Sequence, residues 1–295
     1  MDFNNKHAVI TGGANGIGRC IAETFLHEGV VVTIIDIDKP AGERLQAKYK
    51  NLRFFHGDIA EKETLERFVG SLECFVGLHT KPLTHTASTT TPCCATDSFP
   101  LHVDYLINNA CIGRHGLLSG CSYEDFEYVQ RVGVTAPYYL TSLLLQRDLL
   151  TPGSSIVNIS STRANQSQPD TEAYSAAKGG ISALTHAMAI SLAGKARVNA
   201  INPGWIETAN FHGDTDAAIP TTLQGQTVAL SPATLCEQDS RQHPAGRVGA
   251  PEDIAEMVLF LCSEKAGFIT GESITIDGGM SRLMVYHNDH GWKLE

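Results

Sequence analysis

A tyrosine and a lysine stand four residues apart in the stretch TEAYSAAKGGISAL (171–184). The composition predicts a helix, and residues i and i+4 of a helix share a face, so Tyr174 and Lys178 would point into the same space. Free tyrosine has a pKa of about 10 and is a poor base at neutral pH, but a neighbouring ammonium favours the phenolate. The pair therefore predicts a group that takes a proton from an alcohol or returns one to a carbonyl. Taken alone, the spacing fits an exposed helix face better.

A glycine-rich turn follows the first apolar run of the chain. The run HAVIT (7–11) predicts a strand, and TGGANGIG (11–18) then opens a helix with Ile17, Ile21 and Phe25 on one stripe. Glycines let the backbone approach a pyrophosphate, which the free N–H groups at a helix N-terminus attract. The turn therefore predicts a dinucleotide site. The alternative is a purely structural connection, because a tight strand–helix turn also needs glycine.

A carboxylate ends the next apolar run, VVVTIID (30–36). At this position Asp36 can accept hydrogen bonds from both hydroxyls of an adenosine ribose and would repel a 2′-phosphate. Ile37 and Asp38 follow, and neither side chain can bind that phosphate. The sequence therefore favours NAD as the cofactor and makes NADP the less favoured choice. The alternative is a solvated aspartate with no such role.

The elements that would position these residues alternate regularly along the chain. Continuous apolar runs are typical of strands buried on both faces of a parallel sheet. Helical segments lie between most of them, including 61–72, 126–145 and 251–262. The pattern predicts an α/β, doubly wound Rossmann-type fold, with a seven-stranded parallel sheet, helices on both faces and a single domain over 1–295. The predicted strands are 7–11, 30–36, 52–59, 103–110, 154–161, 196–204 and 272–279.

Two irregular stretches interrupt this alternation. Residues 77–100 are rich in Thr, Pro and Ser and have no periodicity, which predicts a surface insertion. The alternative is a translation artefact of a disrupted gene. Residues 213–242 also lack a clear pattern, and they fall where a lid over a substrate pocket could lie.

Taken together, the motifs resemble those of the short-chain dehydrogenase/reductase family, classical type, over nearly the whole chain. TGGANGIG is similar to the family's TGxxxGxG cofactor turn, and AYSAAK to its YxxxK motif. Ser161 falls where the family's catalytic serine belongs, before Tyr174. INPGWIET (201–208) resembles the PG-x-x-x-T segment, GDI (57–59) the adenine-contacting segment, and DGG (277–279) the end of the last strand.

This resemblance implies an NAD(P)-dependent oxidoreductase that interconverts a secondary alcohol and a ketone by hydride transfer. Ser161 would hydrogen-bond the substrate oxygen, Tyr174 would be the acid/base, and Lys178 would bind the nicotinamide ribose and lower the tyrosine pKa. Thr208 would hold the nicotinamide carboxamide, and Asp58 would contact adenine. The implied cofactor-binding residues are Gly12, Asn15, Gly16, Ile17, Gly18, Asp36, Asp58, Ile59, Asn109, Ala110, Tyr174, Lys178, Pro203, Gly204, Ile206 and Thr208.

The chain departs from the family pattern at two positions. NNAC (108–111) replaces NNAG, so Cys111 stands where glycine is expected. Gly133 replaces an asparagine that marks a helix kink, where a backbone carbonyl holds a water between the catalytic lysine and solvent. Pro137 has no N–H, so it cannot bond the carbonyl of Gly133 four residues earlier. The hypothesis is that Gly133 and Pro137 keep a free carbonyl for that water; the alternative is loss of the relay and a slower enzyme.

Composition limits the remaining possibilities. The 295 residues carry a formal net charge of -10, which argues against nucleic acid or an anionic membrane as the main partner. No signal-peptide pattern or membrane-length apolar run is present, so a cytoplasmic protein is expected. The eight cysteines have no zinc-type spacing, and no metal is expected. The expected partner is a small alcohol or ketone, and the resemblance implies a homotetramer or homodimer. The alternative function is a catalytically impaired dinucleotide-binding scaffold or redox sensor.

Overall fold

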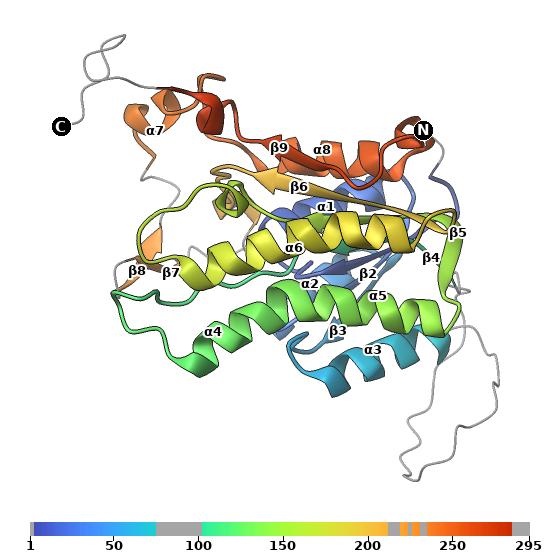
Figure 1. Cartoon of the computed structure of the whole chain (residues 1–295). Coiled ribbons are helices and arrows are strands. Elements are labelled where there is room, and N and C mark those ends of the chain that lie inside the picture. The colour runs from blue at the N-terminus through green and yellow to red at the C-terminus, as the bar shows by residue number, and fades with distance from the viewer. Residues whose placement is uncertain (1–2, 75–101, 212–218, 224–225, 231–234, 285–295) are drawn as a thin grey trace.

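A computed structural model (Figure 1) describes residues 3–74, 102–211, 219–223, 226–230 and 235–284. The insertion predicted at 77–100 lies outside the described residues. Within the described ranges, no helix is long and apolar enough to cross a membrane.

Seven parallel strands form the main sheet in the order β3-β2-β1-β4-β5-β6-β9, as predicted. The order reverses between β1 and β4, which is the point where doubly wound sheets bind their ligands. The strands are β1 (His7–Thr11), β2 (Val31–Asp36), β3 (Leu52–His56), β4 (Val103–Asn108), β5 (Leu150–Ile159), β6 (Ala196–Pro203) and β9 (Ser273–Ile276).

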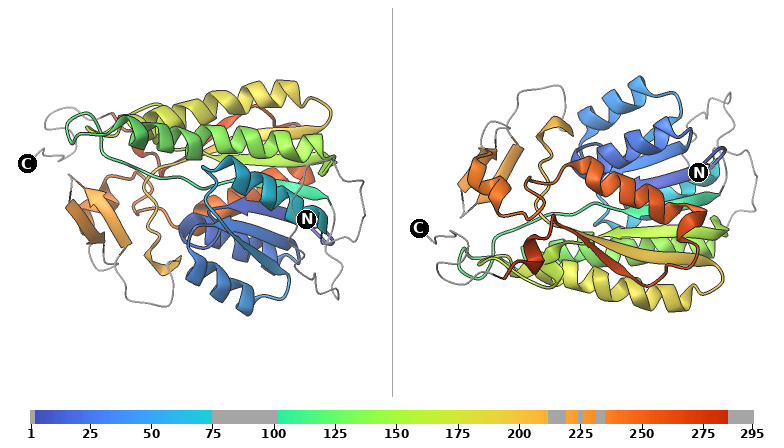
Figure 2. Two further views of the ribbon diagram at one scale, coloured as in Figure 1. Left: turned by 90° about the horizontal axis from the view of Figure 1, so that it is seen from below. Right: turned by 90° about the horizontal axis from the view of Figure 1, so that it is seen from above.

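Helices cover both faces of this sheet (Figure 2). On one face lie α1 (Gly16–His27), α2 (Lys39–Lys48) and α8 (Pro251–Cys262), and on the other lie α3 (Lys62–Cys74), α5 (Ala136–Gln146) and α6 (Glu172–Ser191). The helix α4 (Tyr123–Gln130) packs on α6 through Val129, Ala173 and Ala177.

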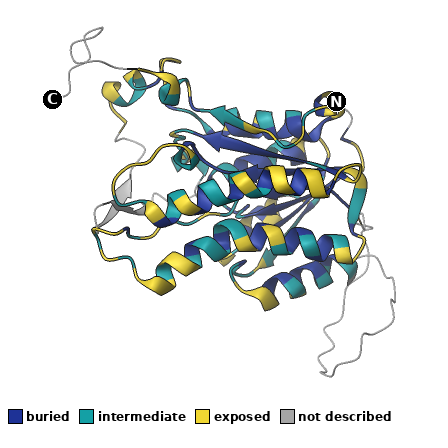
Figure 3. Cartoon of the chain, viewed as in Figure 1, coloured by how far each residue is buried: buried dark blue, intermediate teal, exposed yellow. Residues whose placement is uncertain are grey.

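The alternation of side chains along each strand divides the core into two clusters. Ile10 and Ile34 pack toward α1 and α8, whereas Val9 and Ile35 pack toward α3, α5 and α6. All four are buried, as Figure 3 shows for the strands in general. Continuous apolar runs were therefore a sound guide to the strands, because both faces of this sheet are covered.

Several predicted strands extended too far at their carboxyl ends. β3 ends at His56 and β4 at Asn108, whereas the predictions ran to 59 and 110. β9 ends at Ile276, before a turn in which Gly278 has φ +62°. The residues beyond these strand ends form loops at one edge of the sheet.

The described parts of the segment 213–242 are more regular than predicted. β7 (Ile219–Leu223) pairs antiparallel with β8 (Gln226–Leu230), and α7 (Glu237–Arg241) follows. The sequences IPTTL and QTVAL are rich in β-branched residues, which favour strands, and this short signal was missed.

Candidate active site

The glycine turn lies where β1 meets α1, at the switch point of the sheet. Gly12 and Gly16 have φ of +64° and +57°, values that suit glycine. A Cβ on Gly18 would lie 2.0 Å from the carbonyl oxygen of Gly12, so the turn is closely packed. The N-cap of α1, Asn15, makes no side-chain capping bond, and Ile17 packs against the core. The turn therefore presents helix N–H groups in the way a pyrophosphate requires.

Asn109 and Ala110 fix this turn to the end of β4. The amide Nδ2 of Asn109 donates to the carbonyls of Thr11 and Gly12, at 3.1 and 2.9 Å. The backbone N–H groups of Asn109 and Ala110 both donate to Oγ1 of Thr11, at 3.1 Å each. Thr11 was not among the predicted site residues, although it begins the TGGANGIG motif. Asn109 and Ala110 thus shape the turn through protein–protein bonds.

Asp36 lies beside the turn at the end of β2. Its two carboxylate oxygens accept from the N–H groups of Ala14 and Asp38, each at 2.9 Å. Burial raises the pKa of Asp36 and those two hydrogen bonds lower it, with a net rise. Asn15 donates to Asp38 at 2.8 Å, so two carboxylates border the turn. The nearest basic residue in sequence, Lys39, forms an ion pair with Glu43 at 3.7 Å.

Asp58 follows β3 and is held from α4. Tyr128 donates its hydroxyl proton to Oδ2 at 2.8 Å, and the N–H of Ala60 donates to Oδ1 at 2.8 Å. Burial, together with Asp58, raises the pKa of Tyr128 to about 12. The side chain of Ile59 is buried in the core. Tyr128 is a second residue that the sequence did not reveal, because no local pattern links it to Asp58.

The three predicted catalytic residues come together where β5 ends and α6 begins. Lys178 Nζ lies 5.3 Å from the centre of the Tyr174 ring and donates to the carbonyl of Ile159 at 2.7 Å. The Lys178 side chain is buried, with the residue 3% exposed. Ser161 accepts from the N–H of Arg163 at 3.1 Å, and its hydroxyl is close enough to the phenol of Tyr174 to lower that group's pKa. Positive charge and a hydroxyl group therefore both adjoin the tyrosine.

Burial of the phenol opposes the predicted effect of the lysine. Burial raises the pKa of Tyr174; Lys178 lowers it, and so does the hydrogen bond from Ser161, but the net shift is upward. Burial lowers the pKa of Lys178, whereas Tyr174 and Cys111 raise it. The net shift of the lysine pKa is also upward, so the ammonium stays charged. Lys178 thus acts in the predicted direction, and burial outweighs it among the protein's own groups. Desolvation was the contribution that the sequence did not show.

Cys111, which stands in place of the family glycine, lies at this same position. It is exposed, and it is close enough to Tyr174 and Lys178 for its charge to raise the pKa of both. The departure NNAC therefore places a thiol beside the proposed acid/base pair.

The helix that carries Gly133 is interrupted. A π-helical segment (Arg131–Thr135) separates α4 from α5, and the N–H of Ala136 bonds to the carbonyl of Arg131, five residues earlier. A Cβ on Gly133 would lie 2.9 Å from Cβ of Ala177, the residue before Lys178. The helix over 126–145 is thus interrupted just before Pro137, in keeping with the predicted kink, and the close approach to α6 favours glycine at position 133.

The predicted nicotinamide-side residues follow β6. Pro203 is its buried last residue, and the N–H of Gly204 donates to Ile276 at 2.9 Å. Ile206 forms a bridge with Gly249 and packs against the core. The carbonyl of Thr208 accepts from Phe211 at 2.9 Å. A small cavity of about 180 Å³ lies beside this segment, lined in part by Trp205, Ile206, Arg247 and Asp277.

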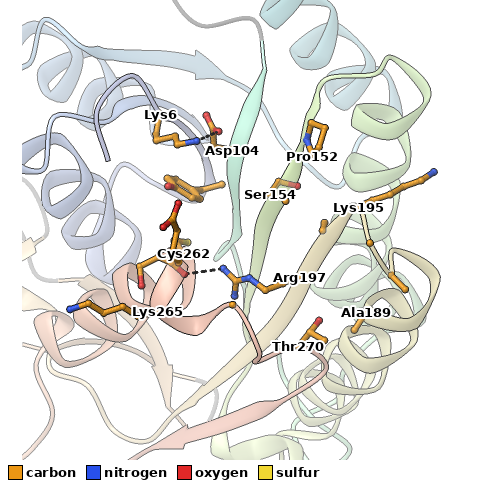
Figure 4. A pocket seen from close by; sticks show the side chains of 18 of the residues that line it. Lys6, Asp104, Pro152, Ser154, Ala189, Lys195, Arg197, Cys262, Lys265 and Thr270 are labelled. Atoms are coloured by element: carbon orange, nitrogen blue, oxygen red, sulfur yellow. Dashed lines mark hydrogen bonds and ion pairs between the residues drawn. The ribbon is translucent and has the colours of Figure 1, made fainter. Parts of the chain in front are cut away.

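A larger cavity lies at the opposite end of the sheet. It has a volume of about 860 Å³ and lies where β4, β5 and β6 begin (Figure 4). Its lining includes Lys6, Asp104, Ser154, Arg197 and Cys262, and none of the predicted site residues. The volume of a cavity therefore does not identify the active site in this protein. The site is identified by the reactive side chains that cluster at the carboxyl ends of the strands. Among the described residues, no group of three His, Cys, Asp or Glu side chains could hold a metal ion.

Comparisons with known proteins show the family to which the chain is related. Residues 6–77 match the family model described as short chain dehydrogenase, and 95–281 match that described as Enoyl-(Acyl carrier protein) reductase. The chain is 38% identical, over 96% of its length, to an uncharacterized oxidoreductase of Thermotoga maritima, of which it covers 99%. It is 31% identical, over 95% of its length, to 2-(S)-hydroxypropyl-CoM dehydrogenase 3 of Xanthobacter autotrophicus, of which it covers 98%.

A solved structure supports the same relationship. An apo SCOR enzyme from Clostridium thermocellum is 40% identical and superposes with a TM-score of 0.78, with 99% of each chain covered. The glycine turn, its uncapped helix and the Asp36 carboxylate fit a dinucleotide. The chain is an NAD(P)-dependent oxidoreductase that belongs to the short-chain dehydrogenase/reductase family.

Proposed function

We propose that this enzyme is an NAD-dependent dehydrogenase that interconverts a secondary alcohol and a ketone, with Ser161, Tyr174 and Lys178 as its catalytic residues. The observation that carries the proposal is the cluster of these three residues, in which a buried ammonium and a hydroxyl group adjoin one phenol. The cluster lies at the edge of the sheet that also bears the glycine turn. The name of the Xanthobacter relative, a hydroxypropyl dehydrogenase, supports a secondary alcohol as substrate.

In the oxidation direction, Tyr174 as phenolate takes the hydroxyl proton of the alcohol. Ser161 donates a hydrogen bond to the same substrate oxygen and stabilises the charge that develops on it. Lys178, held at the carbonyl of Ile159, favours the phenolate through its charge. Bound NAD⁺ would supply the acceptor for the hydride that leaves the alcohol carbon and a second positive charge beside the phenol. In reduction, Tyr174 returns the proton to the oxygen of the carbonyl.

The preference for NAD is supported by the carboxylates beside the glycine turn. Each oxygen of Asp36 accepts one backbone N–H and retains a lone pair for a ribose hydroxyl. A 2′-phosphate in the same place would meet the charges of Asp36 and Asp38.

The proton relay is supported by the interrupted helix. Pro137 has no N–H, so it bonds neither the carbonyl of Gly133 in α-helical register nor that of Val132 in π-helical register. One carbonyl in this segment therefore lacks the donor that residue 137 would ordinarily supply. This supports the hypothesis that Gly133 and Pro137 together replace the family asparagine in holding a relay water.

The test is a screen of secondary alcohols that follows NADH formation by absorbance, run in parallel with NADP. The panel would contain sugars and polyols, hydroxyalkyl thioethers, 3-hydroxyacyl thioesters and steroids. Turnover with NAD that is lost in Tyr174→Phe supports the proposal. A protein that binds NADH tightly but oxidises no member of the panel would instead support the scaffold or redox-sensor alternative.

We also propose a homotetramer or homodimer, on the strength of the family resemblance. Exposed apolar side chains on the described surface, including Tyr138, Ile190 and Phe268, offer area for such contacts. Light scattering after size-exclusion chromatography would test this, and a monomeric mass would contradict it.

A further inference from the structure

The loop between β4 and α4 is held against the start of α6 by two carboxylates. The N–H of Leu117 donates to Oε2 of Glu172 at 3.1 Å. The N–H groups of Leu118 and Ser119 both donate to Oδ1 of Asp170, at 2.7 and 3.2 Å. These three bonds, which we call the carboxylate latch, join segments about fifty residues apart in sequence. Figure 1 shows this loop beside the N-terminal end of α6.

The backbone on both sides of the latch is adapted to it. Asp170 has φ +65°, in the left-handed region that few residues other than glycine adopt. On the facing loop, a Cβ on Gly116 would lie 2.3 Å from Oε2 of Glu172. The hydrogen bond with the Ser119 side chain and those with the loop N–H groups lower the pKa of Asp170. The carboxylate is therefore charged at neutral pH. Its hydrogen bonds help to offset the free energy that a left-handed backbone conformation costs an aspartate.

The latch lies beside the proposed acid/base. Glu172 is the first residue of α6, and Tyr174 is two residues further along. The latched loop begins near Cys111, whose side chain lies close to both Tyr174 and Lys178. Gln130 of α4 donates to the carbonyl of Ala173 at 2.8 Å, so the same turn of α6 is also tied to the helix that follows the loop. The loop is thus fixed beside the first turn of the helix that carries Tyr174.

We propose that Asp170 and Glu172 are positioning residues, which hold the loop Gly116–Ser119 as a wall of the substrate site. The inference rests on the proposed function, because it concerns the substrate that Tyr174 acts on. None of the three bonds of the latch involves the phenol or the glycine turn. Its loss therefore weakens substrate binding while the chemical step and NADH binding are retained.

Replacing Asp170 with glycine tests the loss of the carboxylate without adding backbone strain. Asp170→Gly removes the carboxylate but suits φ +65°, so the fold is kept without strain. Asp170→Asn tolerates the same backbone and keeps one oxygen that can accept both N–H groups. Asp148→Gly is the matched control, because Asp148 also has positive φ, +53°, and lies between α5 and β5 at the other edge of the sheet.

The expected result is a rise in the substrate KM of about tenfold in Asp170→Gly, with kcat changed less than about twofold. Asp170→Asn recovers most of the loss, and Asp148→Gly keeps the wild-type KM. Hydrogen exchange, measured without substrate, is faster at the amides of Leu118 and Ser119 in Asp170→Gly only. Faster exchange with an unchanged KM would overturn the positioning role, and unchanged exchange would overturn the latch itself.

A wild-type enzyme that is inactive on every substrate would contradict the proposed function and, with it, this inference. An active wild type whose variants behave like it would contradict this inference alone.

Discussion

The ammonium of Lys178 lies 5.3 Å from the centre of the Tyr174 ring and is anchored on the carbonyl of Ile159. A fixed charge at this distance favours the phenolate, yet burial of the same phenol favours its protonated form. The protein's own groups leave the pKa of Tyr174 raised, so the lysine offsets only part of the cost of burial. Catalysis near neutral pH then depends on positive charge at this position.

Asp36→Asn tests the preference for NAD. The asparagine side chain keeps one oxygen that can accept a hydrogen bond from the turn. It lacks the negative charge that binds ribose hydroxyls and repels a 2′-phosphate. We expect kcat/KM with NAD to fall about tenfold and the ratio of NAD to NADP activity to fall with it. Steady-state kinetics with both cofactors measure this, and thermal unfolding shows whether the turn persists. An unchanged ratio in a folded variant would contradict the assignment of Asp36.

Gly133→Ala tests the contact between the π-helical segment and α6. The added methyl carbon would lie 2.9 Å from Cβ of Ala177, so α6 must move or the variant must bear strain. We expect a loss of about 1–3 kcal/mol in the free energy of unfolding, with a lower kcat because Ala177 precedes Lys178. The double variant Gly133→Ala/Ala177→Gly removes the close contact and should regain the lost stability. About 1 kcal/mol of the loss should remain, because glycine is unfavourable within a helix. A single variant as stable as the wild type would show that the contact is not restrictive.

Pro137→Ala tests the proton relay. Alanine restores an N–H that can bond a carbonyl of the π-helical segment, which removes the acceptor from any relay water. We expect kcat to fall on the order of tenfold, with a change in its pH profile. The measurement is kcat as a function of pH in a variant shown to be folded. Unchanged turnover and pH profile would sink the hypothesis that Gly133 and Pro137 replace the family asparagine.

His7 provides a test on stability. The residue is 2% exposed; Nδ1 donates to the carbonyl of His102 at 3.1 Å, and Nε2 accepts from the hydroxyl of Thr33 at 2.8 Å. Burial lowers the pKa of His7 to about 4, although the bond to His102 raises it.

An unfolded histidine binds a proton below a pH of about 6.5, and the folded one only below about 4, so stability is lost as pH falls between these values. The loss amounts to about 3 kcal/mol in full, of which about 2 kcal/mol falls between pH 7 and pH 5. Urea unfolding at pH 7 and pH 5 would measure it, with His7→Gln as comparison. The variant should be less stable at pH 7 but lose less on acidification; an equal loss in both proteins would contradict the assignment.

The sequence was most informative where a feature is local. The seven strands are continuous apolar runs because both faces of the sheet are covered, and the glycine turn and the Tyr174–Lys178 spacing each lie within one short segment. The Rossmann-type sheet and the main site elements could therefore be predicted.

What escaped prediction depends on segments distant in sequence or on burial. Tyr128 reaches Asp58 across seventy residues, and the latch to Asp170 spans about fifty, so no local pattern announces either. The π-helical segment shifts the backbone hydrogen bonds by one residue, and its residue types do not distinguish it from an α-helix. The net pKa of Tyr174 depends on desolvation, which only tertiary packing determines.

The most direct test of the account is the pH dependence of kcat for alcohol oxidation in the wild type and in Lys178→Met, which keeps the buried volume but removes the charge. The wild type should follow one ionisation with an apparent pKa below the value of about 10 for free tyrosine. In Lys178→Met that pKa should rise by about one unit or more, and kcat at pH 7 should fall at least about tenfold. Because lysine is also expected to bind the cofactor, the comparison is made at saturating NAD. The same apparent pKa in both enzymes would contradict the claim that the charge of Lys178 enables Tyr174 to exchange protons near neutrality.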